Sequence, residues 1–342
     1  MTVPACRLAW LDIAKGLGMI LVVVGHVMAG SDAAYAPPLA TAIYAFHMPL
    51  FFLLAGFTLK QQAPARFALR KIAVLGLPYL AFLIALGGPA LVLSCGFGAP
   101  QSALGIDTCP VLALKLLSGG SQLSGIFGVF WFVPCLFGGL VIAQLVLAAR
   151  AGPARISAFV LLVCAAYLLP AQFPWSTSIL SIGSVPMAAV LVLIGYALER
   201  ANWVDTRIAL VACTLFALAT LIAGVRVDIK FADFGVPLFS MMGAVALSSL
   251  VIAWSKSFTS VPVLASTLGY VGRNTLPVLY LHQSVHLGLR LAGWHGDLLL
   301  VALSLAAPLM LQSAIGRSRA YLTRHIRFDL SRKSPRIDRP LE

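Results

Sequence analysis

The residues best suited to chemistry in this sequence are a lysine and three histidines that lie inside apolar stretches. Lys15 and His26 lie in the first stretch, His47 in the second and His282 near the C-terminal end of the chain. Imidazole is the side chain best suited to moving a proton near neutral pH, and an apolar environment keeps it neutral and able to act as a base. These side chains are therefore candidates for proton-transfer chemistry. The structural alternative for each histidine is an interhelical hydrogen bond.

The spacing in the first stretch puts Lys15 and His26 on one helix face. Eleven residues at about 100° per residue end about 20° from a whole number of turns. At about 1.5 Å per residue the two side chains lie roughly 16 Å apart along the axis, so this face connects the two halves of a bilayer. Asp12 precedes Lys15 by three residues. It either neutralises Lys15 or takes part in a site.

Further polar candidates lie in later stretches. His47 follows a short connection, so we expect it at a depth comparable to that of His26, where the two imidazoles could face one another. His282 and His286 have the (i, i+4) spacing that can bind zinc, but no carboxylate or thiol accompanies them and we expect no metal. Trp131 is either an anchor at the membrane interface or a platform for a substrate.

The elements that position these candidates must be membrane-spanning helices. Of the 342 residues, 60% are hydrophobic and 10% are charged, which excludes a soluble enzyme. A helix needs about 20 apolar residues to cross the hydrocarbon core. We therefore predict an all-α fold, a polytopic transmembrane helical bundle of about ten spans. The spans are expected near residues 8–29, 39–59, 72–93, 125–149, 155–170, 181–198, 208–224, 234–254, 274–292 and 298–320.

Basic residues predict the orientation of these spans. Nineteen of the 24 Lys and Arg residues fall on the side of both termini, four fall on the other side, and Lys15 lies within a span. The positive-inside rule then puts both termini in the cytoplasm, with residues 1–322 as the transmembrane domain and 323–342 as a basic cytoplasmic tail. The scattered charge favours membrane lipid as a partner over nucleic acid. A cleaved signal peptide at the start of the chain would invert the asymmetry.

The longest outer connection, near residues 94–124, contains Cys95 and Cys109. On the oxidising side of the membrane these two thiols either form a disulfide or remain unpaired. The six cysteines show no CxxC spacing, so a structural zinc site is not expected.

Four segments in this order resemble the acyltransferase-3 family of integral-membrane O-acyltransferases, most closely the branch similar to fucose 4-O-acetylases and exopolysaccharide acetyltransferases. The segments are Trp10–Gly16 running to His26, Phe46–Phe52 running to Phe57, Trp131–Pro134, and Gly272–Leu276 running to His282. The family's pattern of a basic residue, ten intervening residues and a histidine falls on Lys15 and His26. The likeness extends over roughly residues 8–320.

The resemblance implies an enzyme of the bacterial inner membrane that moves an acetyl group from cytoplasmic acetyl-CoA to a sugar hydroxyl. The acceptor would be an exopolysaccharide or a lipid-linked oligosaccharide. The implied catalytic residues are His26, Lys15 and His47, with His26 acting as a base or as a transient carrier of the acyl group. The alternatives are succinyl transfer to a glucan, and a transporter of a sugar or lipid-linked oligosaccharide.

Substrate-binding residues follow from the same resemblance. The family commonly has two arginines after the second span, and here Arg66, Arg70 and Lys71 match that pair only in part. Their charge suits the phosphates of acetyl-CoA. The full set of expected substrate-binding residues is Asp12, Arg66, Arg70, Lys71, Trp131, Arg273, Asn274 and His282.

Overall fold

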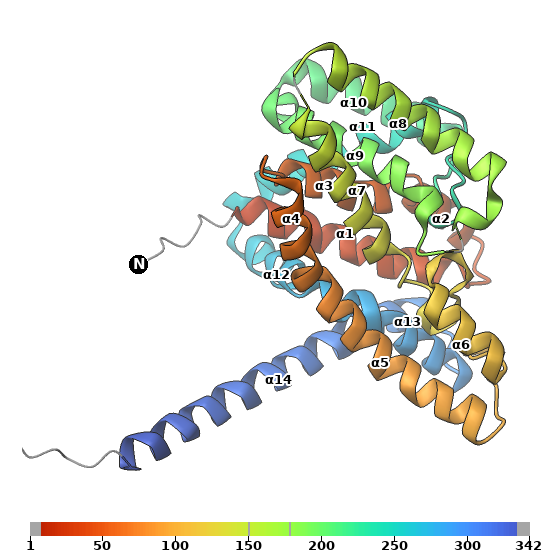
Figure 1. The fold of residues 1–342 in the computed structure, drawn as a ribbon, viewed down its shortest axis with the longest axis vertical. Coiled ribbons are helices and arrows are strands. Elements are labelled where there is room, and N and C mark those ends of the chain that lie inside the picture. The colour runs from red at the N-terminus through yellow and green to blue at the C-terminus, as the bar shows by residue number, and fades with distance from the viewer. Residues whose placement is uncertain (1–7, 150, 178, 334–342) are drawn as a thin grey trace, which may run out of the picture.

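The computed structural model describes residues 8–149, 151–177 and 179–333. Its helices form a bundle from which the C-terminal helix extends (Figure 1). In chain order they are α1 Ala9–Met28, α2 Ala36–Tyr44, α3 His47–Phe57, α4 Pro64–Lys71, α5 Leu77–Leu91, α6 Cys109–Ser118, α7 Phe132–Ala148, α8 Pro153–Gln172, α9 Val185–Arg200, α10 Arg207–Ile222, α11 Phe239–Ser257, α12 Pro262–Arg273, α13 Thr275–Leu291 and α14 Asp297–Lys333.

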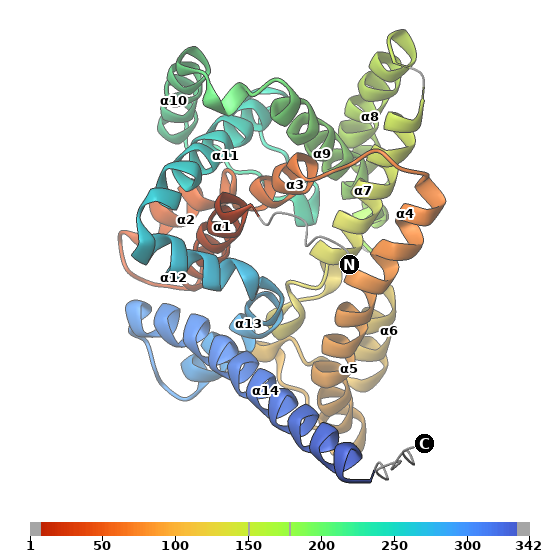
Figure 2. The same cartoon turned by 90° about the vertical axis from the view of Figure 1, so that its left-hand side faces the viewer.

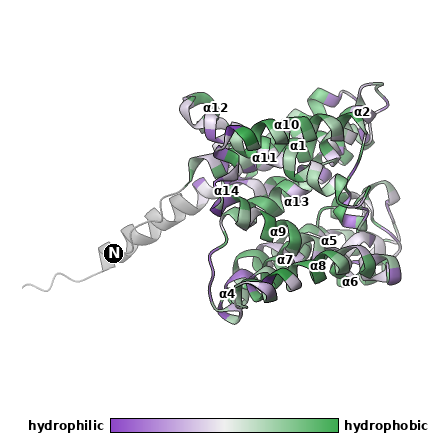
Figure 3. Cartoon of the chain, turned by 90° about the horizontal axis from the view of Figure 1, so that it is seen from above, coloured by the Kyte–Doolittle hydropathy of each residue, from purple (hydrophilic) through white to green (hydrophobic). Residues whose placement is uncertain are grey.

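Within the described residues, eight helical segments are long and apolar enough to cross a membrane. Each coincides with a predicted span, and the helical membrane bundle is confirmed. The two remaining predicted spans, 208–224 and 274–292, form α10 and α13, which have 16 and 17 residues. The total of ten spans therefore stays a prediction. Figure 3 shows hydrophilic residues gathered at two opposite ends of the bundle, with apolar helices between them.

The first helix, α1, lies inside the bundle and packs most extensively against α12. At this crossing a Cβ on Gly272 would overlap the carbonyl group of Asp12, and a Cβ on Gly16 would overlap the carbonyl group of Leu268. The two glycines therefore allow the close backbone approach that apolar surroundings alone do not drive in a membrane. The first predicted span is thus a packed helix of the bundle.

The second predicted span is broken in the middle, between Tyr44 and His47. Pro49 lacks a backbone N–H and cannot continue a helix that comes from α2, but it is tolerated in the first turn of a new helix. The helix accordingly ends at Tyr44, Phe46 adopts a φ of −150°, and α3 begins at His47. The break puts both Tyr44 and His47 at helix ends.

The basic residues expected in a connection before the third span are helical instead. Residues 64–96 form one long apolar segment in which α4 continues into α5. A wide π-helical turn, Ile72–Gly76, lies directly before α5 and its Pro78, where the proline ring would clash with a regular helix. Arg66, Arg70 and Lys71 therefore lie on the first turns of a long helix.

The two ends of the described chain lie on the same side of the bundle, where α1 begins and α14 ends (Figures 1 and 2). This arrangement agrees with an even number of crossings. The predicted boundary at residue 322 falls inside α14, which continues to Lys333. The rest of the predicted tail, 334–342, lies outside the described residues.

Candidate functional site

A polar cavity of about 260 Å³ lies near the C-terminal end of α1. It brings together segments far apart in the sequence: α1, the break between α2 and α3, the start of α7, the loop before α11, and α13. Its lining includes the side chains of His26, Tyr44, His47, Trp131, Asp228, Lys230 and Gln283. Trp131 is 6% exposed, so it lines the cavity and is not an anchor at the membrane interface.

His26 is half-buried and contacts polar groups from two other helices. Its Nδ1 atom lies 3.4 Å from the Tyr44 hydroxyl oxygen and 3.3 Å from Nε2 of Gln283. The His282 ring is also close, with 5.2 Å between the two ring centroids. Contacts from α2 and α13 thus hold Nδ1 of the His26 ring, and Nε2 is the ring nitrogen outside these contacts.

His47 shares the cavity with His26, but the two rings do not pack directly against one another. The Tyr44 ring lies between them, with its centroid 4.7 Å from that of His47 and 6.2 Å from that of His26. The expectation of two histidines at comparable depth is met, with a tyrosine inserted that the sequence reasoning did not include. The sequence feature that could have indicated this tyrosine is the position of Tyr44, three residues before His47 in a segment interrupted by a proline.

Backbone carbonyl groups fix the protonation pattern of the buried histidines. Nδ1 of His47 lies 3.0 Å from the Ile43 oxygen, and Nδ1 of His282 lies 2.8 Å from the Val278 oxygen. A carbonyl oxygen only accepts hydrogen bonds, so each Nδ1 carries a proton and each neutral ring keeps a lone pair on Nε2. The Nε2 atom of His282 is buried and has no hydrogen-bond partner among the described residues.

One wall of the cavity is a loop between α10 and α11 that carries charge. The Lys230 ammonium donates a hydrogen bond to the Leu123 carbonyl oxygen at 2.6 Å, and the backbone N–H of Lys230 donates to the Asp228 carboxylate at 3.1 Å. Burial lowers the pKa of Lys230 from 10.5 to about 8. Burial also raises the pKa of Asp228. Sequence reasoning counted Lys230 only as an outer charge, since nothing local shows that the loop folds inward.

A second cavity, of about 270 Å³, lies at the opposite end of the bundle beside α4. Its charged lining residues are Lys60, Arg70 and Lys71. Gln62 accepts a hydrogen bond from Arg70 at 2.8 Å and so holds the guanidinium group at the cavity. Of the three predicted phosphate-binding residues, Arg70 and Lys71 are brought together here, whereas Arg66 is exposed and lies outside this lining.

The remaining predicted residues lie around the crossing of α1 and α12. Asp12 is buried, Lys15 is half-buried and Arg273 is exposed. Asn274 donates a hydrogen bond to the Tyr270 carbonyl oxygen at 2.8 Å. The electrostatic environment of Lys71 includes the charges of both Arg70 and Lys15, which puts Lys15 on the side of the cationic cavity. These residues belong to the end of α1 away from His26.

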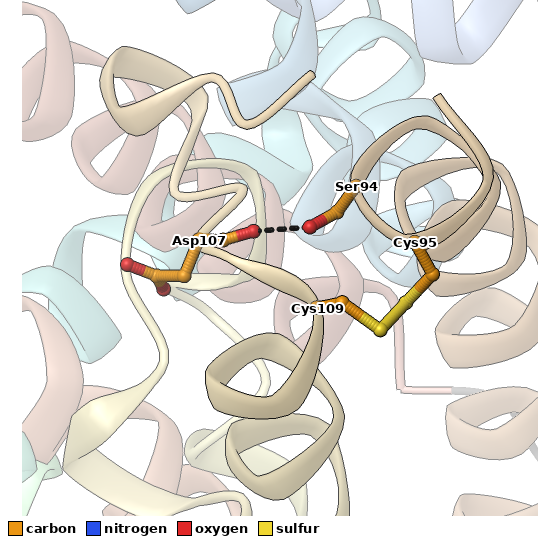
Figure 4. The surroundings of a disulfide bond; sticks show 4 residues. All are labelled: Ser94, Cys95, Asp107 and Cys109. Carbon is orange, nitrogen blue, oxygen red and sulfur yellow. Dashed lines mark hydrogen bonds between the residues drawn. A yellow bond between two sulfur atoms is a disulfide. The ribbon is translucent and has the colours of Figure 1, made fainter. Parts of the chain in front are cut away.

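The connection between α5 and α6 is held by a disulfide between Cys95 and Cys109, which Figure 4 shows. This resolves the alternative left open by the sequence. The hydroxyl of Ser94 donates to the backbone oxygen of Asp107 at 2.6 Å, beside the disulfide. The Asp107 carboxylate in turn pairs with the Lys115 ammonium at 2.9 Å. Together these bonds fix the end of the α5 segment to α6.

Fold and site define a class of protein: a helical membrane protein with a histidine-lined cavity near one end and a cationic cavity at the other. More particularly, the chain belongs to the acyltransferase-3 family, because the family model described as an acyltransferase domain matches residues 8–315. Nodulation protein NolL of Mesorhizobium japonicum is 41% identical over 51 residues, which are 14% of this chain and 14% of that protein. No solved structure matches the chain.

Proposed function

We propose that the protein is an O-acetyltransferase that moves an acetyl group from cytoplasmic acetyl-CoA to a sugar hydroxyl of an exopolysaccharide or lipid-linked oligosaccharide. The observation that carries the proposal is the pair of cavities at the two ends of α3, where His47 lines one and Ala55 lines the other, with α1 packed alongside. The acyltransferase family supplies the reaction class. The positive-inside rule puts the cationic cavity at the cytoplasm and the His26 cavity toward the outer face of the bacterial inner membrane.

The donor binds at the cationic cavity. Acetyl-CoA carries several phosphate charges, and Lys60, Arg70 and Lys71 line a space at the end where the positive residues gather. The neutral acyl-pantetheine arm extends along α1, past Lys15, toward His26. Lys15 lies in the half of α1 near the donor and contributes positive charge to this path.

The acceptor hydroxyl binds in the His26 cavity. Nε2 of His26 takes the hydroxyl proton while the sugar oxygen attacks the thioester carbonyl carbon. The resulting intermediate collapses, the carbon–sulfur bond breaks, and the thiolate of CoA takes the proton from the imidazolium. His47 and Trp131 line the same cavity and position the sugar ring. The products are the O-acetylated sugar and free CoA.

Substitution of His26 tests this assignment. Purified His26→Ala protein should keep its thermal stability but release CoA from acetyl-CoA at least 10²-fold more slowly in the presence of acceptor, the usual scale for loss of a general base. His295→Ala, which removes an exposed histidine, is the matched control and should retain full activity. Mass analysis of the surface polysaccharide should show one acetyl group fewer per repeat in cells with His26→Ala. Wild-type acetylation in those cells would refute the role of His26.

The same assay identifies the donor. Equal concentrations of acetyl-CoA and succinyl-CoA are supplied separately, and the acylated product is weighed by mass spectrometry. We expect acetyl transfer to dominate. A succinylated product would support an acyltransferase whose donor is succinyl-CoA. Substrate flux without release of CoA would indicate a transporter.

A further inference from the structure

A long apolar groove runs along the outside of α9. It has a volume of about 400 Å³, and all of its lining residues are apolar or aromatic. Its lining extends from Trp203 at one end of α9 to Tyr167 and Leu238 at the other. Figure 2 shows that α8 and α10 stand apart on either side of α9 and α11. The groove thus lies between two helices whose outer faces meet the bilayer.

The groove is open to lipid. Trp203, Leu238 and Met242 at its rim are 42%, 61% and 55% exposed, whereas Met187 and Val190 at its base are buried. The predicted span that contains α8 is only 6% buried, so little of this helix packs against the rest of the bundle. A chain molecule can therefore enter the groove sideways from the membrane.

The outer end of the groove adjoins the loop that forms the wall of the His26 cavity. The Tyr167 hydroxyl accepts a hydrogen bond from the Leu238 backbone at 3.2 Å, and the Tyr167 ring packs against Phe234 with 5.7 Å between centroids. Phe234 lies only a few residues after Asp228 and Lys230, which line the cavity. One short segment, residues 227–238, thus separates the apolar groove from the polar cavity.

Two cations lie on this separating segment or directly before it. The Arg226 guanidinium stacks over the Tyr44 ring at 5.0 Å and is exposed. The Lys230 ammonium uses one of its three donors on Leu123 and keeps two. Asp228 is the acidic residue that lines the cavity beside them. The segment that ends the apolar groove thus carries two cations on its cavity side, where Lys230 lines the cavity and Arg226 lies over the Tyr44 ring.

We propose that the groove binds the isoprenoid tail of a lipid-linked sugar acceptor, with its phosphate groups at Arg226 and Lys230 and its sugar in the His26 cavity. These surfaces match the parts of such a molecule. A free polysaccharide has neither an apolar chain to bind in the groove nor a diphosphate to bind these cations. The inference rests on the proposed function, because it names the acceptor class for the same site.

The test uses a photoreactive polyprenyl diphosphate without sugar, bound to the full-length protein in nanodiscs. Crosslinks mapped by mass spectrometry should fall on groove residues such as Met242. Excess unlabelled polyprenyl diphosphate should abolish them, whereas the same excess of phosphatidylglycerol should not. An equal loss of crosslinking with phosphatidylglycerol would show that the groove binds lipids in general and would overturn the proposal. The readout needs neither acetyl-CoA nor an acceptor sugar, so failure of acetyl transfer and failure of tail binding are distinguished.

Matched variants on α10 test the location. Ala212 is exposed and lines the groove, so Ala212→Trp should fill it and lower crosslinking by about tenfold. Thr214 is exposed on the opposite face of the same helix, because two residues turn a helix by about 200°, and Thr214→Trp should change nothing. Equal effects of the two variants would overturn the assignment. Should Ala212→Trp fail to fold, Ala212→Leu gives the same comparison with a smaller side chain.

The cations are tested by changing the head group. Wild-type protein should be protected from crosslinking better by polyprenyl diphosphate than by uncharged polyprenol. Arg226→Gln combined with Lys230→Gln should remove that preference while leaving protection by polyprenol unchanged. An undiminished preference would place the phosphate groups elsewhere and overturn this part of the proposal.

Discussion

Gln283 controls which nitrogen of His26 is free. Its terminal amide contacts Nδ1 of His26, and its buried Oε1 atom has no hydrogen-bond partner in the part of the chain that the structure describes. If Oε1 faces the ring, Nδ1 donates to it and Nε2 keeps the lone pair that a base needs. With Nε2 of the amide facing the ring, Nδ1 would instead accept the hydrogen bond with its lone pair, and Nε2 of the ring would carry the proton. The proposed chemistry therefore requires the first orientation.

Two substitutions at this position separate orientation from packing. Gln283→Leu should lower kcat by roughly 10- to 10²-fold, because the ring loses the partner that selects its tautomer. Gln283→Glu should retain most activity, and the acidic limb of its pH–rate profile should move to higher pH, because a carboxylate stabilises the imidazolium. Equal losses in both variants with unshifted profiles would reduce Gln283 to a packing residue.

Lys230 gives the site a dependence on pH that arises outside the membrane-spanning helices. Burial lowers its pKa to about 8, so its positive charge is present below that pH and is lost as the pH rises through it. The charged groups nearby are Asp228 and Arg226 of the same loop, with His26 across the cavity. If the ammonium binds an anionic acceptor, KM for that acceptor should rise above about pH 8. Lys230→Arg should keep KM constant to pH 9, because guanidinium stays charged. A parallel rise in both proteins would assign the pH dependence to another group.

At the scale of elements, the crossing of α1 and α12 sets the position of Lys15. Gly272→Ala adds a Cβ that overlaps the Asp12 carbonyl group, and overpacking of this kind costs about 1–3 kcal/mol. We expect a lower Tm in detergent and a loss of activity, since α1 must shift. The control is Gly288→Ala on α13, where nothing lies within 4 Å of the added Cβ. That variant should be neutral or slightly more stable, and an equal loss of stability in both would contradict the role of the crossing.

Hydropathy was sufficient to predict where the membrane-length helices form, because runs of apolar residues long enough to span a membrane report directly on these elements, but it did not predict α4, α6 and α12. It also predicted that His26 and His47 share a depth. It did not predict the row His26, Tyr44 and His47, which depends on a break imposed by Pro49. Nor did it predict Lys230 and Gln283 in the cavity. Their placement depends on tertiary contacts, such as the hydrogen bond from Lys230 to Leu123, that no local pattern encodes.

At the scale of the whole molecule, topology decides which substrate each cavity can reach. Reporter fusions after Ala33, after Gln101 and at the C-terminus should read outside, outside and inside, because positive residues gather on the side of both termini. An outer location of residues 94–124 also agrees with the disulfide between Cys95 and Cys109. A C-terminus outside the cell would reverse the assignment of the two cavities.

The disulfide itself should stabilise the outer connection. Replacing both Cys95 and Cys109 by serine should cost roughly 2–3 kcal/mol, the value for closing a short loop, and should lower Tm. Cys164→Ser is the control, because that cysteine is free and exposed on α8. A reducing agent should lower the Tm of the wild-type protein and leave the double variant unchanged. An unaltered Tm in both tests would show that Ser94 and Asp107 suffice to hold the connection.

The distance between the two cavities has an electrical consequence. In direct transfer, the imidazolium of His26 returns its proton to the thiolate beside it, and no net charge crosses the bilayer. In a relay, the acyl group would cross on the protein without CoA, so the thiolate would stay at the cytoplasm while the proton left on the outer side. One positive charge would then move outward against a membrane potential worth about 2.3 kcal/mol per 100 mV. Proteoliposomes with an imposed potassium diffusion potential distinguish the two. The direct mechanism requires a turnover rate that is indifferent to voltage.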